Sequence, residues 1–340
     1  METKMLTTAE EDLSFAASVI KNGGLCAFPT ETVYGLGGNA LNPGAAHDIY
    51  AAKGRPSDNP LIIHIANAAD AEKYCYPTEE FYRLAEIFLP GPLTMILEKR
   101  DIIPPEVTAG LDSVAVRIPS NPVARRLIEL SGVPIAAPSA NLSGKPSPTT
   151  AKHVFDDMNG RIECIIDGGE CDIGLESTII KLTGDGAVLL RPGGVTYEQL
   201  CGALGADKVI IGDSVTGKFE GKPIAPGMKY RHYAPDAPVF LIDGGDAEVC
   251  AYIEQKYAES GEKRVGILCY DEDIALRTLD GAETMGKKSD SRAQAHLLFD
   301  RLRAFHGVDV IYSRLPSKDG IGLAVYNRLI KAAGFHIIKV

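Results

Sequence analysis

The segment KGRPSDNP, residues 53–60, places Lys53 and Arg55 two positions apart, directly before a proline. Pro56 fixes its own backbone φ angle and restricts the residue before it, so the segment predicts a rigid turn between a helix-like and a strand-like segment. A solvated loop can have this composition without any function. A loop that presents fixed positive charge to phosphate or carboxylate oxygens would have it too, because a guanidinium forks onto such oxygens and an ammonium supplies a compact charge.

Two further polar residues interrupt apolar, strand-like runs. His64 lies in LIIHI and shares a face with Ile62, so on this pattern alone a hydrogen-bonded core or edge histidine is favoured over a binding residue. Arg117 lies in SVAVRIP and must reach solvent or pair with an anion, because a buried unpaired guanidinium is very costly. Taken singly, each residue is better explained by structure than by function.

Hydroxyls, an amide and another arginine flank other strand-like runs. They are Thr30 and Thr32, which flank Glu31 after LCAF, Ser139, Asn141, Ser143 and Ser147 after PIAA, Ser177 before TIIKL and Arg191 after AVLL. Open α/β sheets bind ligands at strand ends, so these residues together predict a binding pocket. Its cations suit a polyphosphate or a carboxylate, and its hydroxyls and amide suit a small polar substrate.

The common phosphate-binding motifs are missing or incomplete. No G-x-x-x-x-G-K-[ST] occurs in the sequence. The segment GLGGNA, residues 35–40, fits G-x-G-x-x-A, but ETVY separates it from the preceding strand-like run. We interpret this segment as a glycine-rich turn.

The apolar pattern of the first 211 residues predicts more strands than helices, and therefore a large mixed sheet rather than strict βαβ alternation. The expected strands are LCAFPT, LIIHIA, LTMILE, SVAVRIP, VPIAAPSA, ECIIDGG, STIIKL and AVLLRPG. A helix is expected near the start of the chain, beginning with a capping box formed by Thr8 and Glu11 and ending at Asn22.

Residues 212–238 contain four prolines and no sustained apolar period, which predicts a linker. Beyond it, PVFLID, KRVGILCY and VDVIYSRL are strand-like runs separated by helical stretches. The alternation predicts a small, Rossmann-like α/β domain. We therefore expect a catalytic domain over 1–211, a linker over 212–238 and a second α/β domain over 239–340.

The overall composition limits the possible partners. The chain has 340 residues and a formal net charge of −10, which argues against broad attraction to nucleic acid or anionic membranes. No apolar run approaches the roughly 20 residues that span a bilayer, and the first residues do not form a signal peptide. Seven scattered cysteines without a C-x-x-C spacing favour reduced thiols and a cytoplasmic location over disulfides or a zinc site.

Seven motifs occur in a fixed order: PTETVYGLG, KGRPSDNPLIIHI, PGPLTMIL, VAVRIPSNP, APSANLSGKPSPT, ESTII and LLRPGGV. Together they resemble the YrdC domain of threonylcarbamoyl-AMP synthases. The segment PGMKYRHYAP, followed by a small α/β domain, resembles the long, two-domain form of that family. The resemblance covers nearly the whole chain and implies a large, mixed, twisted sheet with an open concave cavity.

The resemblance implies that L-threonine, bicarbonate and ATP give L-threonylcarbamoyl-adenylate and pyrophosphate, with Mg²⁺ on the phosphates. The product would pass to a separate transferase that modifies tRNA. No membrane partner is expected, and at most weak contact with RNA. Lys53 and Arg55 would then offset the repulsion between a carbamate and the α-phosphate as these two anions meet.

The resemblance also implies roles for individual residues. The catalytic positions are Lys53, Arg55, Ser139 and Asn141. The positions that contact threonine are Thr32, His64, Arg117, Ala137 and Ser177. The positions that contact ATP are Arg55, Asn59, Ser113, Ser139, Ser147, Arg191, Tyr230 and His232. No metal ligand is assigned to the chain. In the linker, two interpretations stay open: MKYRHY docks the linker on one domain, or it closes over the cavity as a lid.

Two other functions are compatible with parts of the pattern. A double-stranded-RNA or ribosome-associated protein would use the basic pocket to dock a backbone, although the acidic chain and the lack of aromatic residues among its cations disfavour this. A carbamoyltransferase of the hydrogenase-maturation type would carry cysteine-rich zinc modules, which this sequence does not have. Pyrophosphate release that requires threonine and bicarbonate together distinguishes the three.

Overall fold

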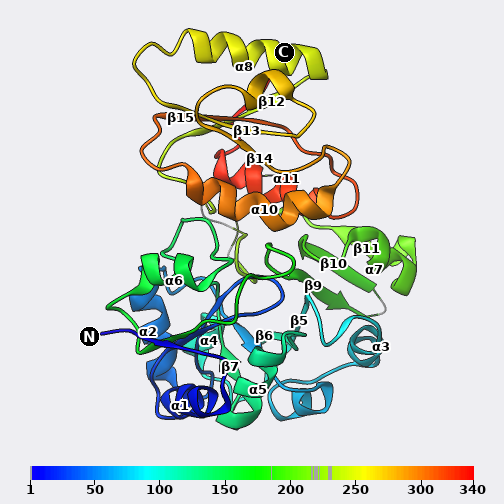
Figure 1. The fold of residues 1–340 in the computed structure, drawn as a ribbon. Helices are drawn as coiled ribbons and strands as arrows, with labels where there is room; N and C mark the ends of the chain where they lie inside the picture. The colour runs from blue at the N-terminus through cyan, green and yellow to red at the C-terminus, as the bar shows by residue number, and fades with distance from the viewer. Residues whose placement is uncertain (1, 185, 216, 218–220, 222, 229–231) are drawn as a thin grey trace. The chain divides into compact units, whose positions relative to one another are not determined.

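The computed structural model describes residues 2–184, 186–215, 217, 221, 223–228 and 232–340, and it contains two compact units (Figure 1). The first unit comprises Met1–Ser143 and Ser147–Lys229, and the second comprises Gly144–Pro146 and Tyr230–Val340. The segment that we predicted as a linker is thus divided between the two units.

The first unit is built on one mixed sheet of eleven strands. In spatial order these are β1 (Lys4–Leu6), β8 (Cys164–Ile166), β2 (Cys26–Phe28), β3 (Gly35–Asn39), β7 (Ile135–Ala136), β4 (Ile62–His64), β6 (Ser113–Arg117), β5 (Leu93–Glu98), β9 (Thr178–Thr183), β10 (Gly186–Arg191) and β11 (Val209–Ile211). Parallel and antiparallel pairings alternate irregularly across it, so the predicted large mixed sheet is confirmed.

Seven α-helices and two 3₁₀ turns are described in the first unit. They are α1 (Glu10–Lys21), α2 (Pro43–Lys53), η1 (Ala68–Lys73), α3 (Glu79–Phe88), α4 (Pro105–Thr108), α5 (Pro122–Ser131), α6 (Ala151–Met158), α7 (Tyr197–Leu204) and η2 (Ala206–Lys208). Leu13 and Ile20 of α1 pack with Leu127 and Ile128 of α5 in a core cluster that also contains Phe28 of β2. These two helices lie side by side under the sheet (Figure 1).

The predicted glycine-rich turn at residues 35–40 is wrong, because Gly35–Asn39 forms strand β3 between β2 and β7. A Cβ atom at Gly37 would lie 2.7 Å from the ring of Phe28 and 2.8 Å from a methyl group of Ile135. The glycines therefore allow neighbouring side chains to approach the strand closely. A strand made mostly of glycine has no alternating side-chain pattern to reveal it.

The predicted capping box of the first helix is also wrong. Helix α1 begins at Glu10 with Ala9 at its N-cap, and no side chain caps it. Asp12 instead accepts hydrogen bonds from both the backbone N–H and the hydroxyl of Thr7, at 2.7 Å each. The acidic first turn still favours the helix electrostatically, because the N-terminal end of a helix carries partial positive charge.

The second unit contains a parallel five-stranded sheet, which confirms the predicted open, Rossmann-like α/β domain. Its strands in spatial order are β14 (Ala282–Thr284), β13 (Val265–Cys269), β15 (Val310–Arg314), β12 (Val239–Asp243) and β16 (Ile337–Lys339), and its helices are α8 (Asp246–Ala258), α9 (Ile274–Arg277), α10 (Ser291–Ala304) and α11 (Gly322–Ala332). Two hydrogen bonds attach residues 144–146 to this unit: Ala234 N to Gly144 O at 2.8 Å, and Arg303 Nη2 to Pro146 O at 2.6 Å.

Candidate active site

Lys53 is the last residue of α2, and its side chain is 3% exposed. Gly54 ends the helix in the left-handed conformation, with φ of 62°, which turns the chain without a steric penalty. The ammonium group of Lys53 donates hydrogen bonds to the carbonyl oxygens of Ser139 and Asn141. The cation is therefore fixed against the loop that follows β7.

The loop after β7 holds its two polar side chains in contact with each other. The Ser139 hydroxyl donates to Oδ1 of Asn141 at 2.6 Å, and the Asn141 amide donates to the carbonyl of Leu142 at 2.8 Å. Backbone bonds tie this loop to β3 through a bridge between Gly35 and Ser139. The structure thus brings together three of the four predicted catalytic residues.

Arg55 lies two residues beyond Lys53, and its guanidinium folds back over its own turn. Its Nη2 donates to the carbonyl oxygens of Asn59 and Pro60, at 3.2 Å each. Asn59 is 2% exposed, and within the described residues its side-chain Oδ1 has no hydrogen-bond donor. A buried acceptor without a donor is costly, so Asn59 is suited to receive a hydrogen bond from a ligand.

His64 and Arg117 are direct register partners on the parallel strands β4 and β6, so their side chains share one face of the sheet. Both are buried, at 3% and 4% exposure. Nδ1 of His64 donates to the carbonyl of Ile135 at 3.3 Å. Desolvation, with a smaller contribution from the charge of Arg117, lowers the pKa of His64 to about 3, so the imidazole is neutral at physiological pH.

Arg117 pairs with Glu31, a buried carboxylate from the loop between β2 and β3. Its Nη2 donates to Oε1 of Glu31 at 2.7 Å, and both side chains are 5% exposed. Nε of Arg117 is buried, and among the described residues it has no acceptor. Of the two expectations for Arg117, contact with solvent or pairing with an anion, the structure shows the second, and the anion is Glu31.

Ser177 lies directly before β9 in a second cluster on the sheet. Its hydroxyl contacts Oγ1 of Thr94 at 2.8 Å and accepts a hydrogen bond from Nη2 of Arg191 at 3.2 Å. Nε of Arg191 also donates to the Ser177 carbonyl at 3.0 Å. Thr94 is the register partner of Arg117 on β5, so this cluster lies next to the His64–Arg117 pair.

The remaining predicted site residues of the first unit make contacts of their own. Buried Thr32 contacts the hydroxyl of Thr30 at 2.8 Å, and the backbone N–H of Ala137 donates to Ile62 at 2.9 Å. The Ser147 hydroxyl donates to the buried carboxylate of Glu176. Ser113 begins β6, four residues from Arg117 and therefore roughly 13 Å along the strand.

The first part of the predicted linker packs on the sheet face that carries His64 and Arg117. Ile62 and Ala115 lie two residues before that pair on the same face, and they form a core cluster with Ile96, Ile179, Leu190, Ala225 and Met228, against which Val188 and Ile224 pack. Nη1 of Arg191 also lies 3.5 Å from the carbonyl of Pro226. Residues 224–228 therefore belong to the structure around the candidate site.

Two residues that we predicted to contact the nucleotide lie beyond this segment. Tyr230 is outside the described residues. His232 belongs to the second unit, where its ring lies 5.5 Å from that of Tyr233. Tyr233 is in turn stacked on Phe299 of α10 at 5.3 Å and lies 5.4 Å from the guanidinium of Arg328 on α11. The second unit thus holds the far part of the linker through aromatic contacts.

Comparison with known proteins adds to this geometry. A family model described as "Telomere recombination" matches residues 18–193, and one described as "Threonylcarbamoyl-AMP synthase, C-terminal domain" matches residues 195–334. The chain is 49% identical to the threonylcarbamoyl-AMP synthase of Pyrococcus abyssi, over 97% of this chain and 96% of the relative. It belongs to the threonylcarbamoyl-AMP synthase family. The resemblance read from the seven motifs is therefore confirmed.

A second curated member of the threonylcarbamoyl-AMP synthase family and a solved structure match nearly the whole chain. The Bacillus subtilis protein of that name is 46% identical over 99% of this chain and 97% of the relative. A solved structure described as P. abyssi Sua5 complexed with L-threonine has a TM-score of 0.93, with 48% identity over 99% of this chain and 100% of that one. Both units of the chain thus have counterparts in the two-domain form of the family.

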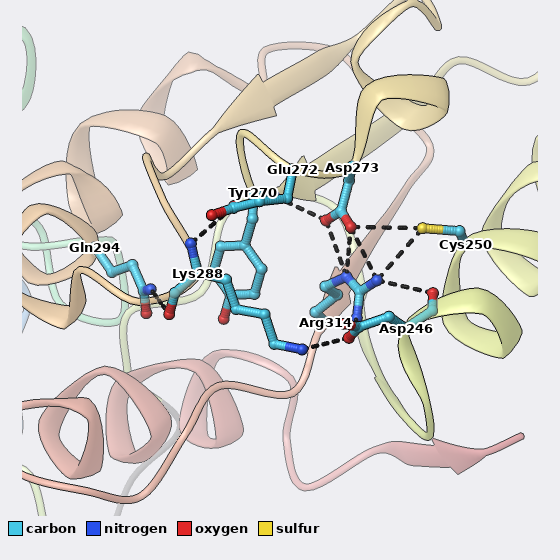
Figure 2. Close-up of polar contacts among 8 residues, drawn as sticks. All are labelled: Asp246, Cys250, Tyr270, Glu272, Asp273, Lys288, Gln294 and Arg314. Carbon is cyan, nitrogen blue, oxygen red and sulfur yellow. Dashed lines mark hydrogen bonds and ion pairs between the residues drawn. The ribbon is translucent and has the colours of Figure 1, made fainter.

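The second unit of this synthase-family chain has its own polar cluster, at the carboxyl ends of β13 and β15 (Figure 2). The chain leaves these neighbouring strands in opposite directions, toward β14 and β16, and open α/β sheets often bind ligands at such a point. Here Nε of Arg314 donates to Asp273 at 2.9 Å, Nη1 to Asp246 at 3.0 Å, and Nη2 to Cys250 at 3.3 Å. All three nitrogens of the guanidinium donate to protein groups, as expected for a structural ion-pair network.

The described residues of this family member contain no group of three or more His, Cys, Asp or Glu side chains that could hold a metal ion. Among them, no helix is both long enough and apolar enough to cross a membrane.

Sequence reasoning did not assign three buried polar residues of the synthase-family site. Glu31 lies inside the first motif, PTETVYGLG, Glu176 lies inside ESTII, and Thr94 lies in PGPLTMIL. A carboxylate next to strand-end hydroxyls could have indicated Glu31 and Glu176, since arginines occur in neighbouring motifs and a buried carboxylate needs a partner. No sequence pattern distinguishes Thr94 from any other threonine in a strand.

Proposed function

We propose that this chain forms L-threonylcarbamoyl-adenylate and pyrophosphate from L-threonine, bicarbonate and ATP. The threonine amine captures the one-carbon unit as a carbamate, with loss of water. A carbamate oxygen then attacks the α-phosphorus of ATP, and pyrophosphate leaves. Two anions must approach each other in this step, so a site that fixes cations beforehand lowers the barrier.

The Nε of Arg117, which has no acceptor among the described residues, carries the proposal. It belongs to a guanidinium that is 4% exposed, beside a histidine that burial keeps neutral. A carboxylate is the group that best satisfies a buried guanidinium nitrogen, and threonine offers one. We therefore assign the threonine site to this sheet face, with Arg117 on the carboxylate and with Thr32, His64, Ala137 and Ser177 as the other walls.

The cations and polar groups beyond this pocket suit the triphosphate. Lys53, Arg55, Ser139 and Asn141 form the proposed catalytic group, and Asn59, Ser113, Ser147, Arg191, Tyr230 and His232 are proposed to contact ATP. Lys53 is held without freedom to reorient, which favours electrostatic stabilisation of the reacting phosphate. Mg²⁺ would enter with ATP as part of the substrate, because phosphate oxygens are its preferred ligands.

The linker is proposed to act as a lid over this face of the sheet. The packing of Ala225 and Met228 beside the His64–Arg117 pair supports it, because residues 229–233 continue directly from this packed segment. Excluding water would protect an acyl-adenylate from hydrolysis. The product is proposed to pass to a separate transferase that builds threonylcarbamoyl-adenosine in tRNA.

The test is a pyrophosphate-release assay with mass spectrometry of the adenylate product. We expect release only when threonine, bicarbonate and ATP are all present. Serine in place of threonine and omission of bicarbonate are the controls. Release that does not depend on threonine, or a product without the carbamoyl carbon of labelled bicarbonate, would contradict the proposal.

A further inference from the structure

Glu31 is a buried carboxylate in a buried stretch of the chain, between Thr30 and Thr32. The side chain is 4% exposed, and each carboxylate oxygen has its own donor: Nη2 of Arg117 at 2.7 Å on Oε1, and the backbone N–H of Ser120 at 3.1 Å on Oε2. Its carbonyl accepts a third bond, from the N–H of Ile173 at 2.8 Å. One residue thus joins three segments of the chain.

Those three segments carry residues of the proposed threonine site. Glu31 is adjacent to Thr32, its Oε1 contacts Arg117, and Ile173 lies four residues before Ser177. The carboxylate of Glu31 occupies both of its oxygens in these contacts. Its contacts with the proposed site therefore run through the groups that it holds.

We propose that Glu31 is a positioning residue, which orients the guanidinium of Arg117 so that Nε meets the carboxylate of the amino-acid substrate. This inference rests on the proposed function. An arginine side chain has several rotatable bonds and loses conformational entropy when a ligand fixes it. A partner that fixes the side chain beforehand removes this entropy cost from ligand binding. Glu31 accepts the hydrogen bond of Nη2. Nε lies in the same rigid plane and has no acceptor among the described residues, so it can donate to the substrate.

The buried environment makes this pairing necessary as well as useful. Neutral His64 lies beside Arg117 and supplies no counter-charge. Without Glu31, the guanidinium of Arg117 would be a buried cation with no carboxylate partner in the ligand-free protein. That cost favours movement of the Arg117 side chain toward solvent. Glu31 therefore keeps Arg117 on the site face before threonine arrives.

The first experiment compares Glu31→Ala and Glu31→Gln with the wild-type full-length chain. We expect Glu31→Ala to raise the KM for threonine by about 10- to 100-fold, the range for losing a hydrogen bond to a charged group. The KM for ATP should change less than about threefold, because the nucleotide does not bind through Arg117. Glu31→Gln keeps an oxygen acceptor for Nη2 and should recover part of the loss.

A readout that separates positioning from general damage is discrimination between threonine and threoninamide, which lacks the carboxylate. Calorimetry on the wild type should show strong preference for threonine, and Glu31→Ala should lose most of it. Glu163→Gln is the matched control, because Glu163 also accepts a backbone N–H, that of Leu25 at 2.7 Å, away from Arg117. That variant should keep the wild-type preference.

A double-mutant cycle with Arg117→Ala makes the second test. Removing Arg117 alone leaves Glu31 as a buried carboxylate without its cation, facing an anionic substrate group. The double variant Glu31→Ala/Arg117→Ala should therefore bind threonine at least as well as Arg117→Ala does. If the two residues acted independently, the fold-loss of threonine affinity in the double variant would be the product of the fold-losses in the two single variants.

The outcomes separate the two proposals. A wild-type chain that neither binds threonine nor releases pyrophosphate with it would overturn the proposed function. Wild-type activity together with unchanged threonine–threoninamide preference in Glu31→Ala would overturn only the role of Glu31. Multiplying losses in the double-mutant cycle would also overturn it.

Discussion

His64 and Arg117 lie opposite each other on β4 and β6, with both side chains buried on the same face of the sheet. The histidine is buried beside a guanidinium that already has its own carboxylate, Glu31. Protonation of His64 would place a second cation in this space. The pair therefore consists of one permanent cation and one imidazole that stays neutral.

The first prediction concerns the pH dependence of stability. The pKa of His64 is lowered to about 3 in the folded protein, by burial and then by Arg117, from an ordinary value near 6.5. Between these values the unfolded chain binds a proton that the folded chain does not. The free energy of unfolding should thus fall on acidification from about pH 6.5, by up to about 1.4 kcal/mol per pH unit from this group.

Urea unfolding between pH 4 and pH 8 measures this effect, and His64→Gln is the comparison. The variant should show a shallower fall over the same range, because glutamine cannot titrate. Nitrogen NMR shifts of His64 should stay those of a neutral ring down to pH 5. A midpoint near 6.5 for His64 would contradict the buried, neutral assignment.

The second prediction concerns Arg117 itself. Arg117→Ala should weaken threonine binding by about 2–5 kcal/mol, the range for truncating one partner of a buried charged contact. ATP binding should change much less. Calorimetry with each ligand separately is the measurement, and equal losses for both ligands would place Arg117 outside the threonine site.

The third prediction separates the two cations of the KGRPSDNP turn. Lys53→Met and Arg55→Ala should both lower kcat more than they raise the KM for threonine, since their charges act when carbamate and phosphate approach. Only Lys53→Met should also lower the free energy of unfolding, by about 1–3 kcal/mol, because it leaves the buried carbonyls of Ser139 and Asn141 without their donor.

Steady-state kinetics and urea unfolding on the same preparations test this. Arg55 is half-buried, and its Nη2 donates to carbonyl oxygens of its own turn, those of Asn59 and Pro60. A half-buried side chain costs less to truncate than a fully buried one, so Arg55→Ala should lower the free energy of unfolding less than Lys53→Met does. Unchanged kcat in both variants would return the turn to a purely structural role.

The sequence predicted the parts of the fold that local patterns encode. Strands β4 and β6 could be predicted because each lies in a short apolar run, which His64 or Arg117 interrupts. Strand β3 was not, because its glycines carry no side-chain pattern. The contact between Glu31 and Arg117 joins residues 86 positions apart, and no local periodicity reports such a pairing.

The fourth prediction concerns the network at Arg314 in the second unit. Asp273 is 7% exposed and accepts from Nε of Arg314 and from the backbone N–H of Tyr270 at 2.9 Å each. Asp273→Leu should cost about 3–5 kcal/mol, because it leaves a buried guanidinium with one carboxylate fewer. Asp280→Asn, at an exposed position, is the control and should stay within about 0.5 kcal/mol of wild type.

Unfolding of the full-length chain, followed by circular dichroism, measures both variants. A double variant, Asp273→Leu/Arg314→Leu, should recover part of the loss, since it removes both charges together. If Asp273→Leu unfolds like wild type, the network does not stabilise the second unit. A ligand site would then become the better explanation for these charges.

The last prediction concerns the segment of the linker that packs on the site face. Met228 is 5% exposed in the cluster with Ile62, Ala115 and Ala225, so an aspartate there would be a buried charge without a partner. Met228→Asp should lower the free energy of unfolding by about 2–5 kcal/mol or release the segment from the sheet. Met228→Leu keeps the apolar volume and should cost less than about 1.5 kcal/mol.

Limited proteolysis distinguishes release of the segment from loss of the whole fold, because only release exposes residues 223–228 while the sheet stays protected. If the linker is a lid, a released segment should also lower adenylate synthesis and increase hydrolysis of the product, since water would reach the acyl-adenylate. Met228→Leu should keep wild-type adenylate synthesis and the wild-type rate of product hydrolysis. Wild-type synthesis in a Met228→Asp chain with a cleavable segment would mean that the segment only connects the two units, and the lid proposal would fail.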